Sequence, residues 1–184
     1  MTPDELVHRL LSQAFRAIGE AGRTAGNRRL IVVAELFQAA PLGLARVARG
    51  EETATDVLAR LREQAGQQGL TTWLDSVIEQ QSRWSTANSG GGESLLYRLL
   101  YIALIDLRME AHDTKNEEAW RVAHLFHRIP LQLARVGAGD GSYADLLAQL
   151  REDAQQLGCA AWLEHASEEG ARPATAGVEG EAGV

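Results

Sequence analysis

Apolar residues recur at every fourth position near the start of the chain and again near its middle. The first series is Leu6, Leu10, Ala14 and Ile18, and the second is Leu95, Leu99, Ala103 and Leu107. Residues four apart stack on one face of an α-helix, so each series predicts an amphipathic helix with one buried face. No segment shows the apolar–polar alternation that is typical of a β-strand, and the pattern therefore predicts an all-α protein.

Residues that begin and end helices divide the rest of each segment into four further helices. Helix starts are indicated by Asn27 and Asn116, by Pro41 and Pro130, and by Thr53 and Ser142, and helix ends by Gly50, Gly69, Gly139 and Gly158. Asn, Ser and Thr side chains cap the first amides of a helix, proline fits its first turn, and glycine adopts the left-handed conformation that ends it.

The two segments are copies of one another at a fixed offset of 89 residues. Between 9–76 and 98–165, 27 of the 68 aligned pairs are identical, and Trp73-Leu74, for example, returns as Trp162-Leu163. Such self-similarity is typical of repeat architectures. We therefore predict two tandem copies of a small multi-helix unit, packed with pseudo-two-fold symmetry. The predicted units are 1–84 and 93–169, with a flexible Gly/Ser linker over 85–92 and a disordered tail over 170–184.

Composition and charge narrow the classes of function. The 184 residues carry a net charge of −7, with 10 acidic and 10 basic side chains in 3–84 but 13 and 7 in 92–169. This acidic balance disfavours nucleic-acid binding. The single cysteine, Cys159, excludes an intrachain disulfide and a Cys-based zinc motif. The chain starts without a signal-peptide pattern, and its most apolar segment, 95–107, is too short to span a bilayer. We predict a cytoplasmic protein without a membrane partner, and the scarcity of lysine suggests a bacterial source.

Opposite charges occupy equivalent positions of the two copies. Arg28 and Arg29 align with Glu117 and Glu118. Equivalent residues near a two-fold axis face each other, so this difference would favour pairing of the first unit with the second over pairing of two like units. The alternative interpretation is drift on a solvated surface.

Carboxylates and histidines are added in the second copy. Asp106 and Glu110 lie on the apolar arc of their helix, where the first copy has alanines, and need a partner such as Arg108, Arg128, Arg135 or a nearby histidine. His124 and His127 stand three residues apart, where the first copy has Glu35 and Gln38. These four residues, Asp106, Glu110, His124 and His127, have the side chains to chelate a divalent metal. The alternative function is therefore a metal-dependent hydrolase or nuclease that uses them.

A second pattern in the same helix also concerns nucleases. Arg121 and His127 form an R-x5-H spacing, which resembles the Arg–His motif of the helical HEPN ribonucleases. Val122 stands where that family usually has a polar residue, and the first copy lacks both the arginine and the histidine. We interpret this match as chance.

Trp120 provides the last candidate. It lies between the angular positions of His124 and His127 on a polar helix face, and its counterpart Ile31 is also large and apolar. An exposed Trp ringed by polar groups is typical of an interface anchor, although packing against the other unit would give the same pattern. We predict a non-catalytic protein-binding or regulatory protein, toxin neutralisation being one such role, with Trp120, His124, His127 and Ile31 contacting another protein. No cofactor is expected, and a homo-oligomer is compatible with the pattern.

Overall fold

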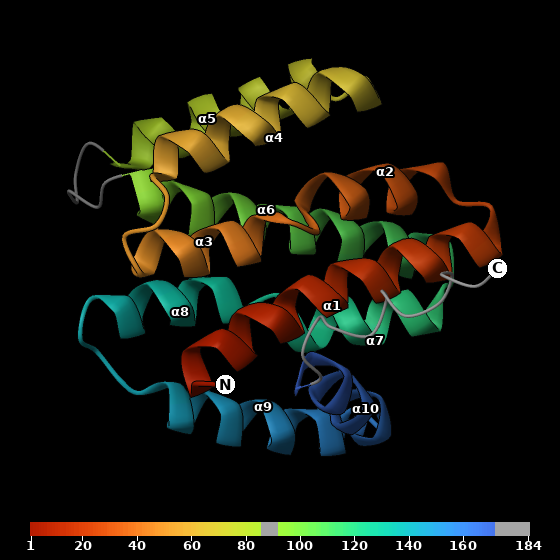
Figure 1. The fold of residues 1–184 in the computed structure, drawn as a ribbon. Helices are drawn as coiled ribbons and strands as arrows, with labels where there is room; N and C mark the ends of the chain where they lie inside the picture. Colours follow the sequence, from red (N-terminus) through yellow and green to blue (C-terminus); the bar gives the residue numbers. More distant parts are fainter. Residues whose placement is uncertain (86–91, 172–184) are drawn as a thin grey trace, which may run out of the picture.

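The computed structural model describes residues 1–85 and 92–171, which form helices joined by short turns (Figure 1). In chain order the helices are α1 (Pro3–Ala25), α2 (Arg28–Phe37), α3 (Ala40–Ala48), α4 (Ala54–Gln68), α5 (Thr71–Ser85), α6 (Gly92–Asp113), α7 (Glu117–Phe126), α8 (Ile129–Gly137), α9 (Tyr143–Gln156) and α10 (Ala160–Ala171). No strand occurs in these two ranges. The prediction of an all-α protein is confirmed.

The predicted helix starts are confirmed by their hydrogen bonds. Asn27 accepts a hydrogen bond from the Leu30 amide at 3.1 Å, and Asn116 does the same from the Ala119 amide at 3.1 Å. Thr53 and Ser142 cap α4 and α9 in the same way. Each cap satisfies an amide that the helix itself leaves without an acceptor, so these starts are determined by local sequence.

The structure describes only the edges of the predicted linker and tail. α5 extends through Ser85 and α6 begins at Gly92, so both edges of the predicted linker 85–92 are helical. α10 continues through Ala171, two residues into the predicted tail 170–184. The remaining parts of both predictions, 86–91 and 172–184, lie outside the described residues.

Helices from both halves of the chain are interleaved at the centre of the molecule. We call residues 1–85 the first half and 92–171 the second half. α1 packs on α2 and α7, and α6 packs on α7 and α2. The α4–α5 hairpin lies on one side of this central group and the α9–α10 hairpin on the other (Figure 1).

Each hairpin also contacts the first helix of the opposite half. α4 and α5 pack on α6, and α9 and α10 pack on α1. The buried side chains consequently form a single cluster that includes residues of both halves.

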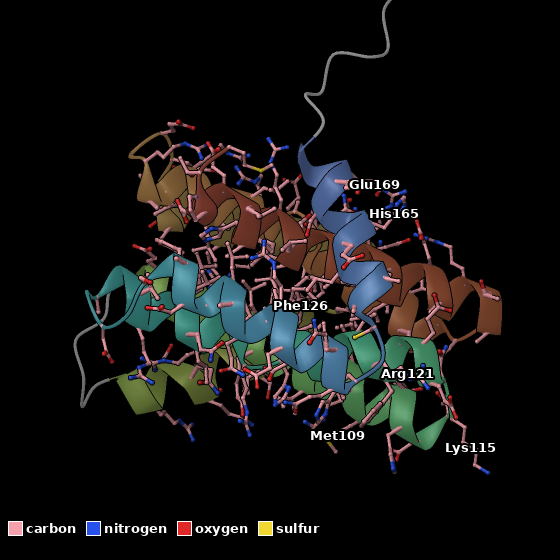
Figure 2. The ribbon with its side chains drawn as sticks, turned by 90° about the horizontal axis from the view of Figure 1, so that it is seen from below. Met109, Lys115, Arg121, Phe126, His165 and Glu169 are labelled. Carbon is pink, nitrogen blue, oxygen red and sulfur yellow. The ribbon has the colours of Figure 1, made fainter. Side chains whose placement is uncertain are left out.

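An aromatic pair anchors each hairpin to the centre. The Phe37 and Trp73 rings meet edge to face with centroids 6.1 Å apart, and the Phe126 and Trp162 rings do so at 5.7 Å. Both phenylalanines are fully buried, and the tryptophans are half-buried at the rim. In Figure 2 Phe126 lies near the middle of the view, whereas Lys115 lies at the edge of the molecule.

One stretch, 28–48, is long and apolar enough to cross a membrane by length and composition. It comprises α2 and α3, and 56% of its most apolar window is buried within the fold. The stretch contributes Leu30, Phe37 and Leu44 to the core. Buried core helices and signal sequences both pass this test, so it is weak evidence for a membrane span. It is a different stretch from 95–107, which the sequence indicated as the most apolar segment.

Candidate functional site

A pocket of about 420 Å³ opens between α6, α7, α8 and α9. Its polar lining consists of Arg108, His124, His127, Arg128, Gln132, Gln149, Asp153 and Gln156. Leu125, Ile129 and Leu157 complete it. We call it the Arg108 pocket. It contains two of the sequence-predicted site residues, His124 and His127, together with two arginines that were not predicted as site residues.

The local sequence explains how these side chains converge. His124 lies in the last turn of α7, His127 follows that helix as its C-cap, and Arg128 precedes α8. Pro130 in the first turn of α8 starts a new helix immediately after the turn. The histidines therefore lie where α7 gives way to α8, and Arg108 of α6 reaches them from the neighbouring helix.

Arg108 lies between the two imidazole rings. Its Nη1 is 3.5 Å from His124 Nδ1 and 3.4 Å from His127 Nε2. His127 Nδ1 is 2.6 Å from the backbone oxygen of His124. This nitrogen therefore carries a proton and donates a hydrogen bond to the carbonyl oxygen. The hydrogen-bond geometry thus assigns His127 Nε2 and His124 Nδ1 as acceptors from Arg108, which leaves the His124 Nε2–H as a donor.

The environment of the two histidines favours their neutral forms. Burial lowers the pKa of His124, and the charges of Arg108 and Arg128 lower it further, against a smaller opposing effect of Asp153. Burial likewise lowers the pKa of His127. The hydrogen bond to the His124 backbone raises this pKa, whereas the charges of Arg108 and Arg128 lower it further. Both imidazoles are therefore neutral at pH 7.

The two arginines of the pocket have no carboxylate within ion-pairing distance among the described residues. Asp153, the one acid in the lining, accepts a hydrogen bond from Gln149 at 2.9 Å. The pocket thus holds two guanidinium charges and one carboxylate charge, in a chain whose net charge is −7. It is a locally positive site in an acidic protein.

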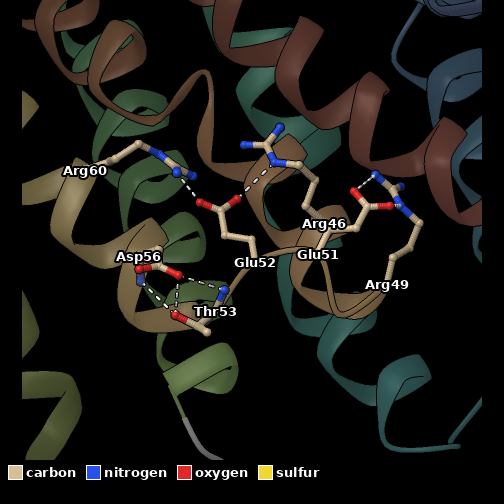
Figure 3. A network of polar contacts seen from close by, with 7 residues as sticks. All are labelled: Arg46, Arg49, Glu51, Glu52, Thr53, Asp56 and Arg60. Carbon is tan, nitrogen blue, oxygen red and sulfur yellow. Dashed lines mark hydrogen bonds and ion pairs between the residues drawn. The ribbon is translucent and has the colours of Figure 1, made fainter.

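Several arginines elsewhere in the fold are paired with carboxylates. At the α3–α4 connection, Glu52 binds both Arg46 and Arg60, and Glu51 binds Arg49 (Figure 3). The hydrogen bond from Arg60 is the largest effect that lowers the pKa of the Glu52 carboxyl. These pairs belong to a structural network, whereas neither guanidinium group of the Arg108 pocket is paired with a carboxylate among the described residues.

Trp120 lies beside the pocket and supports it. Its ring stacks on the His124 ring with centroids 4.8 Å apart and an interplanar angle of 25°. Trp120 is half-buried and packs against the core. Its neighbour His124 is half-buried as well, and His127 is only 9% exposed. The face that the sequence indicated as exposed is partly covered, because α8 and α9 fold over its end. Ile31 is half-buried on α2 and lies outside the pocket lining.

The structure does not bring Asp106 and Glu110 to the histidines. Asp106 binds Arg29 through two hydrogen bonds of 3.0 Å, and Glu110 accepts a 3.0 Å hydrogen bond from Asn27. The partner of Asp106 is therefore an arginine of α2, and the predicted pairing with Arg108, Arg128, Arg135 or a nearby histidine is wrong. Among the described residues, no three His, Cys, Asp or Glu side chains are grouped to hold a metal ion.

The R-x5-H pair is also separated by its contacts. Arg121 is exposed and binds Glu117 of the preceding helical turn at 3.5 Å. His127 instead contacts Arg108 and the backbone of His124.

The first half has different chemistry at the equivalent positions. Arg108 corresponds to Gly19 and His124 to Glu35, which binds Arg23 and Gln68. Gln132 corresponds to Gly43, where an added Cβ would lie 3.0 Å from Val57, so α3 and α4 approach each other closely. The exchange of Gly19 for Arg108 between the copies is the sequence signal that could have identified the arginine.

Comparison with known proteins adds no assignment: no family model, curated protein or solved structure matches the chain.

Proposed function

We propose that this chain is a non-catalytic binding protein whose partner is another protein. The observation that carries this proposal is the Arg108 pocket, in which two arginines that have no carboxylate partner in the described part of the chain adjoin the half-buried Trp120. Tryptophan and arginine are the residues most often found to dominate the energy of protein interfaces. A partner that presents an acidic side chain next to an apolar one would complement both features.

The remaining groups of the pocket fit binding better than catalysis. Each imidazole nitrogen that would accept a proton from a substrate faces the Arg108 guanidinium. That guanidinium also places a positive charge between the two rings, which opposes a metal cation there. The positions of these atoms therefore favour the binding interpretation over the metal-dependent alternative.

We further propose that the scaffold is a duplicated unit with pseudo-two-fold symmetry. The bounds of α2 and α7, and those of α3 and α8, are offset by the same 89 residues as the sequence repeat. His8 Nε2 lies 3.2 Å from the hydroxyl of Tyr97, its counterpart at that offset, as expected of residues near a two-fold axis. Asn27 binds Glu110 while Asn116 binds the backbone of Ala21. Such reciprocal contacts are typical of an isologous interface.

Charge differences support pairing of the two unlike halves. Arg29 does not pair with its counterpart Glu118 but with Asp106, whose counterpart is Ala17. Two copies of the second half, paired in the same way, would place Glu118 opposite Asp106. The repulsion between those carboxylates would disfavour such a pair. On this basis the first half preserves the scaffold, and the second half has acquired the binding site. The expected bacterial source and cytoplasmic location remain predictions from composition.

The test is capture of a partner from a lysate of the source organism with the full chain as bait. Wild type is compared with Trp120→Ala and with Arg108→Gln. The control variant is Arg121→Gln, which removes an exposed arginine of α7, the helix that carries Trp120. We expect one protein to be retained by wild type and by Arg121→Gln and to be lost with the other two variants. Circular dichroism confirms that each bait is folded. Capture that is equal for all four baits would overturn the proposal.

A further inference from the structure

We propose that the Arg108 pocket is a carboxylate-binding site. Its ligand is an acidic group held between Arg108 and Arg128, with His124 Nε2–H and the pocket glutamines as further donors. This inference deepens the proposed function, because an acidic side chain of the partner would be the ligand there.

The donors that would hold such a group are present and oriented. Arg108 uses Nη1 toward the two imidazoles, and its other N–H groups have no acceptor among the described residues. An arginine guanidinium binds the two oxygens of a carboxylate through parallel hydrogen bonds. Arg128, at the start of α8, lines the same pocket and is exposed to solvent. A carboxylate that enters from solvent therefore meets Arg128 first and Arg108 at greater depth.

The two histidines fix the position of Arg108. The imidazole acceptors hold Nη1, and His127 is held in turn by the His124 backbone, while Trp120 stacks on the His124 ring. A guanidinium that is already oriented loses less conformational entropy when its ligand binds. The histidines and Trp120 thus act as positioning residues for the arginine.

The charge of the pocket selects among oxyanions. Arg108 and Arg128 against Asp153 leave one net positive charge when both histidines are neutral. A singly charged carboxylate neutralises this charge. A phosphate monoester, with nearly two negative charges at pH 7, would leave the pocket negative until a histidine gains a proton. We therefore assign a carboxylate at neutral pH.

A bound anion and the histidine protons are linked. The carboxylate offsets the Arg108 and Arg128 charges that lower the histidine pKa values, so both pKa values should rise when it binds. By the same linkage, affinity for the anion should increase as the pH falls through these pKa values. The groups that face the histidines are Arg108 from α6, Arg128 from the start of α8 and Asp153 from α9.

The experiment is an NMR titration of the histidine ring signals in the full chain. Acetate, glutarate and inorganic phosphate are added separately at pH 7, with chloride at the same ionic strength as the reference. We expect the carboxylates to shift the His124 and His127 signals saturably, and phosphate to bind more weakly. Arg108→Gln should weaken carboxylate binding about tenfold or more. Arg135→Gln, which removes an exposed arginine of α8, should leave it unchanged.

The outcomes separate this inference from the proposed function. Saturable carboxylate shifts that depend on Arg108 support the site, even if no protein partner is found. No saturable shift, or an equal response in Arg108→Gln, overturns it, even if a partner binds through Trp120. Phosphate binding tighter than carboxylate binding at pH 7 overturns the assignment of the ligand. Free acetate or glutarate that binds as tightly as the captured partner would identify a small carboxylate, instead of a side chain, as the natural source of the group.

Discussion

The ion pair between Arg29 and Asp106 joins the two halves of the chain, and its contribution can be measured by a double-mutant cycle. Arg29 Nε and Nη2 each lie 3.0 Å from an oxygen of the Asp106 carboxylate. The same guanidinium lies over the Trp73 ring, 5.2 Å from its centroid. The cycle uses Arg29→Ala, Asp106→Ala and the double variant, and measures the free energy of unfolding of each.

The expected coupling follows from geometry and exposure. Two unit charges about 4 Å apart attract by about 4 kcal/mol at an effective dielectric constant of about 20. The Arg29 and Asp106 side chains are 35% and 29% exposed, so solvent screening and the ordering of both side chains remove most of this attraction. We expect a coupling of about 1 kcal/mol. The Trp73 contact adds about 0.5–1 kcal/mol for Arg29 alone.

The two single variants should therefore lose different amounts of the free energy of unfolding. Arg29→Ala should lower the free energy of unfolding by about 1.5–2 kcal/mol and Asp106→Ala by about 1 kcal/mol. The double variant should be no less stable than Arg29→Ala, because the pair is already lost. Urea unfolding followed by circular dichroism measures all four proteins, and the coupling should shrink in 1 M salt, where the screening length is about 3 Å.

The exposed Arg16–Glu20 pair of α1 is the matched control. Its side chains are 51% and 55% exposed and stand four residues apart on one helix. Such pairs contribute about 0.3–0.5 kcal/mol. If the coupling between Arg29 and Asp106 is no larger than that of the control, the reasoning that this pair holds the halves together is refuted.

Three further perturbations test other parts of the structure. An added Cβ at Gly22 would lie 2.8 Å from the Leu30 Cβ, so Gly22→Ala should destabilise the fold by about 1–3 kcal/mol. At Gly66 an added Cβ would lie 3.8 Å from the Thr71 Oγ1, an ordinary contact, so Gly66→Ala should stabilise the fold by about 0.5–1 kcal/mol. Thermal unfolding distinguishes the two signs. Phe126→Ala removes a fully buried ring and should cost about 3–5 kcal/mol in urea unfolding, and a loss below 1 kcal/mol would contradict its place in the core. Because the pKa of His127 is lowered in the folded state, the unfolded chain gains a proton at this residue at a higher pH than the folded chain does. The contribution of His127 to the free energy of unfolding is therefore complete above about pH 6.5 and is lost as the pH decreases. His127→Gln should make this fall less steep in urea titrations at a series of pH values, and an unchanged slope would argue against a neutral buried His127.

The helices could be predicted from the sequence because their determinants are local. Asn27 and Thr53 specify helix starts through hydrogen bonds that span three residues. The contacts between halves could not be predicted in the same way, because they depend on how distant segments meet. Asp106 was recognised as a carboxylate that needs a partner, but only the packing of α2 on α6 shows that the partner is Arg29.

The candidate site could be predicted from the sequence only in part, because it also depends on how distant segments meet. Differences between the copies identified Trp120, His124 and His127, which do lie together. The burial of His127 was missed, because the helical wheel of α7 contains no information on α8 and α9. The role of Arg108 was missed because it was treated as a partner for carboxylates. In the structure it faces imidazoles instead.

The packing of each hairpin on the first helix of the opposite half has a consequence for synthesis on the ribosome. When the first half has emerged, the α4–α5 hairpin still lacks α6, and α1 still lacks α7, α9 and α10. Contacts between segments so far apart in sequence form late and slow the folding of a chain. Productive folding should therefore wait until most of the second half has been translated. A nascent chain that stalls before α6 would expose the apolar faces of α1 and α5, and such chains are the ones most prone to aggregate or to require a chaperone.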